Sequence, residues 1–281
     1  MEFVLNEEGK NVDHHFPTLI LPALSIGNVP QLSVDLLISS IPAHVVGYLD
    51  DPSILPCVGN NAYLPFPPGD LALPLQVYES PSHQLTIIQQ RSPVIKGRML
   101  DFAKNLADFS VSNGKSHVII LSSLDSGRKK MISSSDKDIY YISSKDETCV
   151  DCEKLGWKRL EEYDPSHTRW KYLSLLADGS AVMPQEGPFE DEDFGSDDDY
   201  YPSLPFAALF SCCKAKGLKV TCILSYCSEG DNIPDSFQLA DAACKLLSLN
   251  PSEFSGSDNG GWLVPFSWSS VYGPPPDMTL F

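Results

Sequence analysis

The pattern of apolar and polar residues predicts a strand followed directly by a helix near the start of the chain. Residues 18–24 form an apolar run typical of a strand buried on both faces. Gly27 and Asn28 indicate a turn, and the Asn28 side chain is placed to cap a helix by accepting the backbone N–H of Gln31. The spacing i, i+3, i+4, i+7 then marks one apolar helix face, formed by Val34, Leu37, Ile38 and Ile41.

The rest of the chain repeats this succession of elements. Further strands are predicted at 43–49, 75–78, 84–90, 117–121, 139–142 and 218–226. Helices are predicted from about Gly97 to Asn113, from a cap at Ser203 to Gly217, and over 234–247. The strand at 84–90 begins with apolar–polar alternation, which is typical of a half-exposed strand. Because strands and helices alternate, we expect an α/β fold with a mostly parallel sheet and helices on both faces.

Two segments depart from this pattern and set the expected domain limits. Residues 186–201 hold eight carboxylates and no Lys or Arg, so they cannot bury apolar area and are interpreted as a disordered, solvated insert. Residues 250–281 are rich in Gly, Pro and Ser. We therefore expect a single α/β domain over 1–249 that carries the acidic insert, followed by an extended C-terminal tail over 250–281.

Charge and composition exclude several classes of partner. The 281 residues are 42% hydrophobic, which indicates a globular protein, and the net charge is −17. Nucleic acids and anionic membranes select Lys and Arg, so neither is an expected partner. No apolar run is long enough to cross a bilayer, and residues 1–8 lack the apolar core of a signal peptide. The eight Cys residues are then expected as reduced thiols in a cytoplasmic and nuclear protein.

The strand–turn–helix invites an anion-binding interpretation, because helix N-termini attract phosphate. The chain lacks both the G-x-G-x-x-G pattern and a Walker loop there, so we favour a plain turn at Gly27 and a helix cap at Asn28. Gly114, Lys115 and Ser116 resemble the end of a phosphate loop, but the Gly required five residues earlier is Phe109. We reject that second site.

The remaining chemical inventory predicts no catalytic, cofactor or metal site. Cys149 and Cys152 form a single C-x-x-C, and no second pair of ligands follows at zinc spacing. The chain has no G-x-S-x-G elbow and no H-E-x-x-H helix. We therefore interpret the protein as a non-enzyme that uses no cofactor.

A long loop over residues 50–74 is the first candidate surface for a protein partner. It contains six prolines, yet it also carries Tyr63, Leu64 and Phe66. A loop of this length inside a compact domain is usually functional or disordered, and its aromatic residues argue against disorder. It either packs over the sheet edge or offers apolar side chains to a partner, and the sequence leaves both possibilities open.

The block Thr18–Leu37 resembles the start of the proteasome assembly chaperone 2 family. Val46–Leu49, Leu85–Pro93 and the ending Pro274–Phe281 support the resemblance, which is good from Thr18 to about Ile120 and then thins until the tail. It implies a three-layer α/β/α fold like that of nucleoside phosphorylases without their catalytic site. It also implies a non-enzymatic subunit that pairs with a chaperone 1-like partner and binds proteasome α subunits to promote α-ring assembly.

The family tail motif is a hydrophobic residue, then Tyr, then any terminal residue, and here Leu280 replaces the Tyr. The resemblance still makes Met278, Thr279, Leu280 and Phe281 candidate partner-binding residues, with a terminal carboxylate beside an aromatic ring. Two alternatives stay open: a phosphorylase-like enzyme, which would need His, Arg and carboxylates around a pocket, and a generic scaffold protein without a proteasome link.

Overall fold

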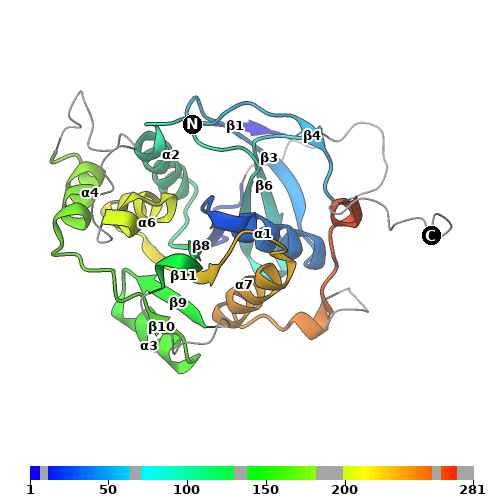
Figure 1. The fold of residues 1–281 in the computed structure, drawn as a ribbon. Helices are drawn as coiled ribbons and strands as arrows, with labels where there is room; N and C mark the ends of the chain where they lie inside the picture. The colour runs from blue at the N-terminus through cyan, green and yellow to red at the C-terminus, as the bar shows by residue number, and fades with distance from the viewer. Residues whose placement is uncertain (7–11, 64–70, 130–137, 182–198, 255–260, 271–281) are drawn as a thin grey trace, which may run out of the picture.

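A mixed β-sheet forms the centre of the molecule (Figure 1). The structure is a computed structural model that describes residues 1–6, 12–63, 71–129, 138–181, 199–254 and 261–270. Within these residues the sheet has nine strands in the order β1-β3-β6-β7-β2-β8-β11-β9-β10. Their bounds are β1 Glu2–Leu5, β2 Thr18–Pro22, β3 His44–Asp50, β6 Leu75–Ser80, β7 Leu85–Gln90, β8 His117–Asp125, β9 Ile139–Ser143, β10 Lys158–Arg159 and β11 Lys219–Cys227. The short strands β4 Gly59–Asn60 and β5 Leu71–Ala72 pair with each other.

The predicted parallel sheet is confirmed for its four central strands. β2 runs parallel to both neighbours, with Leu19 opposite Thr86 of β7 and opposite Val118 of β8. β8 in turn runs parallel to β11 along its whole length. Antiparallel pairs flank this centre, because β6 reverses direction beside β7 and β9 reverses direction beside β11.

Helices cover both faces of the sheet. Their bounds are α1 Val29–Ser40, α2 Met99–Ser112, α3 Asp146–Lys154, α4 Thr168–Asp178, α5 Tyr200–Ser203, α6 Pro205–Ala215 and α7 Ile233–Leu246. α2, α4 and α6 lie together on one side, and α1 and α7 lie side by side on the other (Figure 1). Successive side chains of β2 therefore enter two different cores: Leu19 and Leu21 contact the first group of helices, and Ile20 contacts the second.

Three local predictions were wrong: the Asn28 cap, the exposure of β7 and the Ser203 cap. Asn28 adopts a left-handed backbone conformation (φ 52°) and makes no side-chain cap, so its main-chain bend redirects the chain into α1. β7 is buried on both faces: α1 covers the face of Leu85, Ile87 and Gln89, and the opposite face, with Thr86 and Ile88, belongs to the core on the other side of the sheet. Ser203 belongs to the short α5, and Leu204 occupies the cap position of α6.

The two segments set apart by composition are only partly described. Residues 182–198 lie outside the described residues, but the end of the expected insert is packed: Tyr201 is buried, and its hydroxyl lies 2.9 Å from that of Tyr226. The expected tail also begins with packed residues, because Trp262 and Trp268 are buried against the α1–α7 side. Residues 271–281 lie outside the described residues, so the extended tail stays a prediction there.

Candidate partner-binding surface

A cavity of about 630 Å³ opens where α1 ends and β3 begins. Its lining includes Ile38 and Ile41 from the end of α1, Val45 from β3, and Leu263 and Val264 from the C-terminal segment. We call this cavity the α1–β3 hollow. β1 pairs with Gly47–Asp50 of β3. Asn6, which follows β1 and lines the hollow, donates its backbone N–H to the carbonyl of Val46 over 3.1 Å, so the hollow lies beside the edge of the sheet where β1 ends.

One wall of the hollow is Tyr63, and a buried polar network fixes it. The Tyr63 hydroxyl donates to Asp35 Oδ1 over 2.6 Å, and Arg91 Nη2 donates to Tyr63 over 2.9 Å. Arg91 also pairs with both oxygens of Asp35, at 2.8 and 3.3 Å, and Gln89 Nε2 donates to Asp35 Oδ1 over 2.6 Å. The Tyr63 ring meets the Tyr78 ring edge-on at 5.9 Å. Both ends of the Tyr63 side chain are therefore held.

Burial sets the charge states of this network. Burial and the neighbouring Asp35 carboxylate raise the pKa of Tyr63 well above its ordinary value, so its hydroxyl keeps its proton. Burial alone would lower the pKa of Arg91, but the charge and hydrogen bond of Asp35, together with the neighbouring Tyr63 and Tyr78, outweigh burial, and the pKa is raised. The network is thus an Arg91–Asp35 ion pair with a neutral Tyr63 as an additional donor.

Local sequence patterns do not reveal this network, because Asp35, Tyr63 and Arg91 lie 28 to 56 residues apart along the chain. One signal was present: Asp35 stands beside Val34 and Leu36 on a helix whose apolar residues continue almost all round. A carboxylate inside such a helix needs a buried partner. Arg91 supplies it from the residue that follows β7.

The outer rim of the hollow is apolar and held by backbone contacts. Leu263 and Phe266 are each 48% exposed. The Leu263 N–H donates to Ser40 Oγ over 2.9 Å, and the Ser267 N–H donates to the carbonyl of Ala62 over 3.0 Å. The segment that carries the two exposed side chains is therefore attached to both α1 and the loop before Tyr63.

The two predicted partner segments can now be placed only in part. Tyr63 lines the hollow, where its hydroxyl points into the network and its ring forms the wall. Leu64 and Phe66 lie outside the described residues, as do Met278, Thr279, Leu280 and Phe281. Whether these six residues bind a partner stays a prediction. Sequence analysis did not single out Leu263 or Phe266, although Trp262 and Trp268 beside them are unusual in a polar tail.

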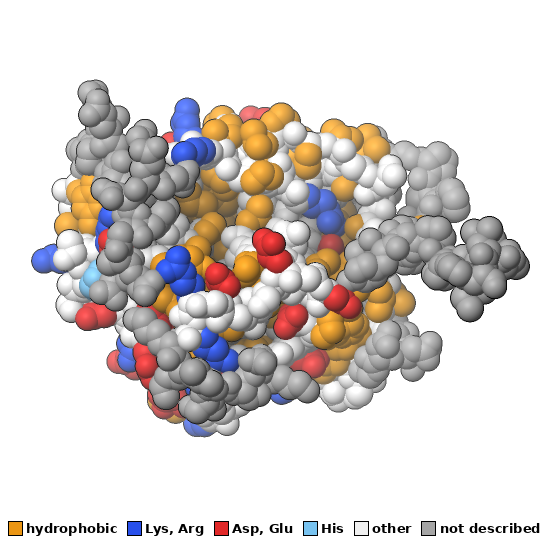
Figure 2. Space-filling view, viewed as in Figure 1, with side chains coloured by type: hydrophobic (Ala, Val, Ile, Leu, Met, Phe, Trp, Pro, Cys, Tyr) orange, Lys and Arg blue, Asp and Glu red, His pale blue; other side chains and the backbone are white. Residues whose placement is uncertain are grey.

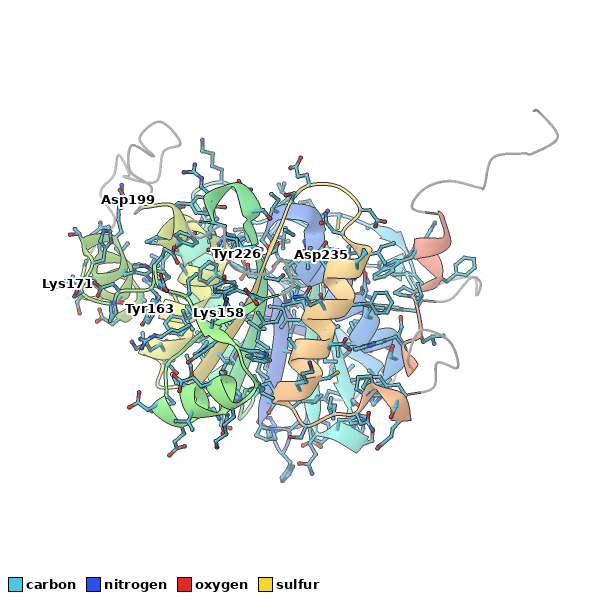
Figure 3. The ribbon with its side chains drawn as sticks, turned by 60° about the horizontal axis from the view of Figure 1, so that its bottom comes forward. Lys158, Tyr163, Lys171, Asp199, Tyr226 and Asp235 are labelled. Carbon is cyan, nitrogen blue, oxygen red and sulfur yellow. The ribbon has the colours of Figure 1, made fainter. Side chains whose placement is uncertain are left out.

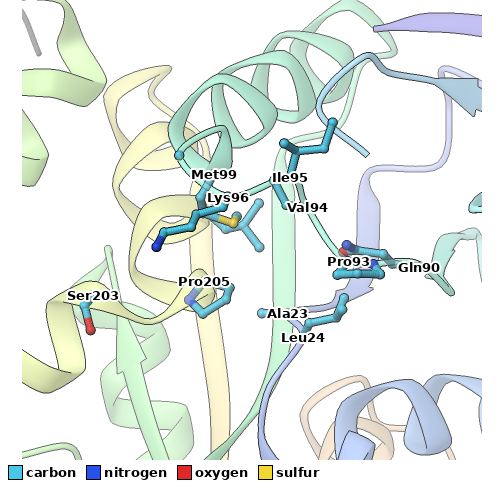
Figure 4. A pocket seen from close by; sticks show the side chains of 12 residues that line it. Ala23, Leu24, Gln90, Pro93, Val94, Ile95, Lys96, Met99, Ser203 and Pro205 are labelled. Carbon is cyan, nitrogen blue, oxygen red and sulfur yellow. The ribbon is translucent and has the colours of Figure 1, made fainter. Parts of the chain in front are cut away.

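A second cavity, of about 240 Å³, lies at the carboxyl ends of β2 and β7 (Figure 4). This is the end of a parallel sheet where α/β enzymes bind their ligands. Ala23, Val94 and Leu209 make its walls apolar, and the Lys96 side chain lies beside Met99 over it. Lys96 is the single ionisable side chain among the described residues of this lining. The set of His, Arg and carboxylates that a phosphorylase-like enzyme would need is not gathered there.

The possible anion site at the start of α1 is filled by protein. A Cβ added to Gly27, which has φ +69°, would lie 2.3 Å from Nδ2 of Asn232. Asn232 is buried and reaches over the turn from the segment before α7. The favoured interpretation of Gly27 as a turn residue therefore agrees with the structure, and its close approach to Asn232 explains the need for glycine.

The C-x-x-C residues lie on α3, where Cys149 is half-buried and Cys152 is buried. Burial raises the pKa of Cys152 to about 12, which leaves the thiol protonated and unreactive at neutral pH. In the part of the chain that the structure describes, no cluster of three or more His, Cys, Asp or Glu side chains could hold a metal ion. Helices in the same residues are all too short or too polar to span a membrane.

Other exposed residues do not belong to the lining of the hollow. Hydrophobic side chains gather along the upper side of the face in Figure 2, over the loop that leads into β4, where Leu55 and Val58 are exposed. In Figure 3, Asp199 lies on the α4 side of the molecule, away from Asp235 on α7. Asp199 pairs there with Arg169 over 3.1 Å.

Comparison with known proteins identifies the family. The model of the PAC2 family matches residues 19–250. Proteasome assembly chaperone 2 of Nematostella vectensis is 32% identical over 243 residues, which cover 83% of this chain and 90% of that protein. The Danio rerio protein of the same name is 29% identical and covers 91% of both chains.

Solved structures agree at the level of the fold. Pyrococcus furiosus PbaA, an archaeal homolog of proteasome-assembly chaperone, superposes with a TM-score of 0.58 over 89% of this chain and 86% of its own, at 17% identity. Pyrococcus furiosus PbaB, an archaeal proteasome activator, gives 0.57 over 88% and 89%, at 15% identity. The resemblance seen in the sequence is thus confirmed, and the chain belongs to the PAC2 family of proteasome assembly chaperones.

Proposed function

We propose that this protein is a non-enzymatic subunit of a proteasome assembly chaperone. In this proposal it pairs with a related, chaperone 1-like chain, and the heterodimer binds proteasome α subunits and promotes α-ring assembly in the cytoplasm and nucleus. The family match over residues 19–250 carries the proposal. The apolar second cavity supports it against the phosphorylase-like alternative, because its described lining offers little acid–base chemistry.

Depletion of the chain in its own cells tests this function. Separation of proteasome species on native gels should then show fewer complete α rings and more free or misassembled α subunits, and re-expression should reverse the change. An unchanged distribution after complete depletion would contradict the proposal and favour a scaffold unrelated to the proteasome.

The proposed contact with the α ring includes the end of the chain. Pro274–Pro276 favours an extended polyproline II conformation, so the nine residues from 273 to 281 could reach roughly 28 Å at about 3.1 Å per residue. Leu280 and Phe281 would then enter a groove between α subunits. Deletion of Thr279–Phe281 should weaken α-subunit binding while heterodimer formation and thermal stability persist. A loss of stability with unchanged binding would indicate a strap across the chain's own domain.

A further inference from the structure

We propose that the α1–β3 hollow is a docking site for an uncharged, apolar segment of a second PAC2-family chain, with Leu263 as its exposed anchor. The proposal rests on the proposed function, in which the chain pairs with a related chaperone. It adds the surface that makes this contact and the chemistry of the segment that fills it.

The shape of the hollow suits an apolar side chain. Its volume of about 630 Å³ is well above that of a single large side chain. Its lining is uncharged: Ile38, Ile41, Val45 and Val264 stand beside the polar side chains of Asn6, Ser39, His44 and Asn61. Leu263 and Phe266 stand at the rim with about half of their surface exposed. Apolar side chains beside a concave apolar surface are the usual centre of a protein–protein interface.

The hollow is also held in shape before any partner binds. Tyr63 is fixed through its hydroxyl by Asp35 and Arg91, and Leu263 is fixed through its backbone by Ser40. A surface that is ordered in advance loses less conformational entropy on binding, so more of the apolar burial becomes affinity. The Arg91–Asp35 ion pair therefore holds the Tyr63 side chain, which lines the hollow, in a fixed position.

Charge favours this surface over the rest of the molecule. The chain carries a net charge of −17, yet no Asp, Glu, Lys or Arg lines the hollow among the described residues. His44 is its single imidazole. A partner segment with carboxylates would desolvate them without a Lys or Arg to pair with in the described lining, which is costly. The complementary occupant is an uncharged apolar segment, and two chains meeting there bring no like charges into contact.

The rival occupant is the chain's own C-terminal segment, because Leu263 and Phe266 stand only a few residues before Val271. A test must therefore distinguish a second chain from residues 271–281. Val150 on α3 provides the matched control, because it is also an aliphatic residue with 48% exposure, and α3 lies on the opposite side of the molecule (Figure 1).

The experiment uses the full chain purified as its complex with the related chaperone. A photo-crosslinking amino acid replaces Leu263 in one sample and Val150 in the other, and the crosslinked peptides are identified by mass spectrometry. We expect the probe at 263 to crosslink to a peptide whose own sequence belongs to the PAC2 family, and the probe at 150 to give no such product. Crosslinks from 263 to residues 271–281, or to no family chain while the complex is intact, would overturn the inference.

Affinity provides the second readout. Leu263→Asp should weaken the heterodimer by about tenfold or more, whereas Val150→Asp should change the affinity by less than about twofold. Thermal melting of each variant must stay close to wild type, because both side chains are half exposed. If the heterodimer forms and both variants bind alike, the docking site is wrong and the proposed function stands. If no family chain copurifies with wild type, the proposed function itself fails and the docking site fails with it.

Discussion

Replacement of Arg91 by Met tests whether the buried network is held together by its ion pair. Met keeps an apolar stem similar to that of Arg but removes the guanidinium. The Asp35 side chain, which is only 7% exposed, would then lose both of its bonds to Arg91, at 2.8 and 3.3 Å. It would keep the Tyr63 hydroxyl and Gln89 Nε2 as donors, each at 2.6 Å.

The expected loss follows from these contacts. Removal of one partner of a buried ion pair typically lowers the unfolding free energy by about 3–5 kcal/mol. Because Asp35 keeps two hydrogen-bond donors, we expect Arg91→Met to cost about 3 kcal/mol, the lower end of this range. In a domain of this size that corresponds to a fall in Tm of roughly 6–12 °C. Asp35→Asn should cost less, because the Arg91 side chain is 20% exposed and can reach water.

Urea unfolding followed by circular dichroism measures each variant. Arg98→Met is the matched control, because the Arg98–Asp101 pair has a similar distance of 3.2 Å but both side chains are 56% exposed. This control should change stability by less than about 0.5 kcal/mol. The double variant with Asp35→Asn should cost less than the sum of the singles. A cost below about 1 kcal/mol for Arg91→Met would refute the argument that the pair is structurally important.

Three further predictions concern stability. A short Gly-Ser linker in place of residues 186–198 should leave Tm nearly unchanged, because so acidic a segment cannot bury apolar area, whereas extending the replacement through Tyr201 should lower it. Burial, with the charge of Lys219, lowers the pKa of His117 to about 4, so the unfolded chain binds more protons and stability should fall from pH 6.5 toward 4, but less in His117→Gln. Burial raises the pKa of Cys212 and Cys244 to about 12, so stability should also fall as pH rises above about 9, where the thiols of the unfolded chain ionise. Cys244→Ala should make this fall less steep, and a stability that rises above about pH 9 would contradict the prediction.

Local sequence patterns predicted the central elements because their signals lie within a few residues. The apolar run before Gly27 and the helical spacing from Val34 to Ile41 specify β2 and α1 without long-range information. The exposure of β7 could not be predicted in this way. Gln89 looks like a solvent-facing residue, but it is fully buried. Its Nε2 donates hydrogen bonds to Asp35 Oδ1 and to the carbonyl of Gln31, which satisfy the amide inside the protein.

The candidate site depended even more on distant contacts. Asp35, Tyr63 and Arg91 come from a helix, a loop and the end of a strand, and no local pattern relates them. The rim at Leu263 was hidden inside a segment whose Gly, Pro and Ser content indicates a tail. Ser40 and Asp241 attach that segment to α1 and α7 through Leu263 and Trp262. The residues of this surface are therefore far apart in the sequence, and they come together only in the folded chain.

Affinity purification of the tagged full chain from its own cells, followed by quantitative mass spectrometry, tests the central claim most directly. The account predicts that a second PAC2-family chain is recovered in near-equal amount, together with proteasome α subunits. An unrelated protein of similar charge that carries the same tag provides the background. Recovery of the chain without α subunits and without a related chaperone would contradict the assignment as a proteasome assembly chaperone subunit.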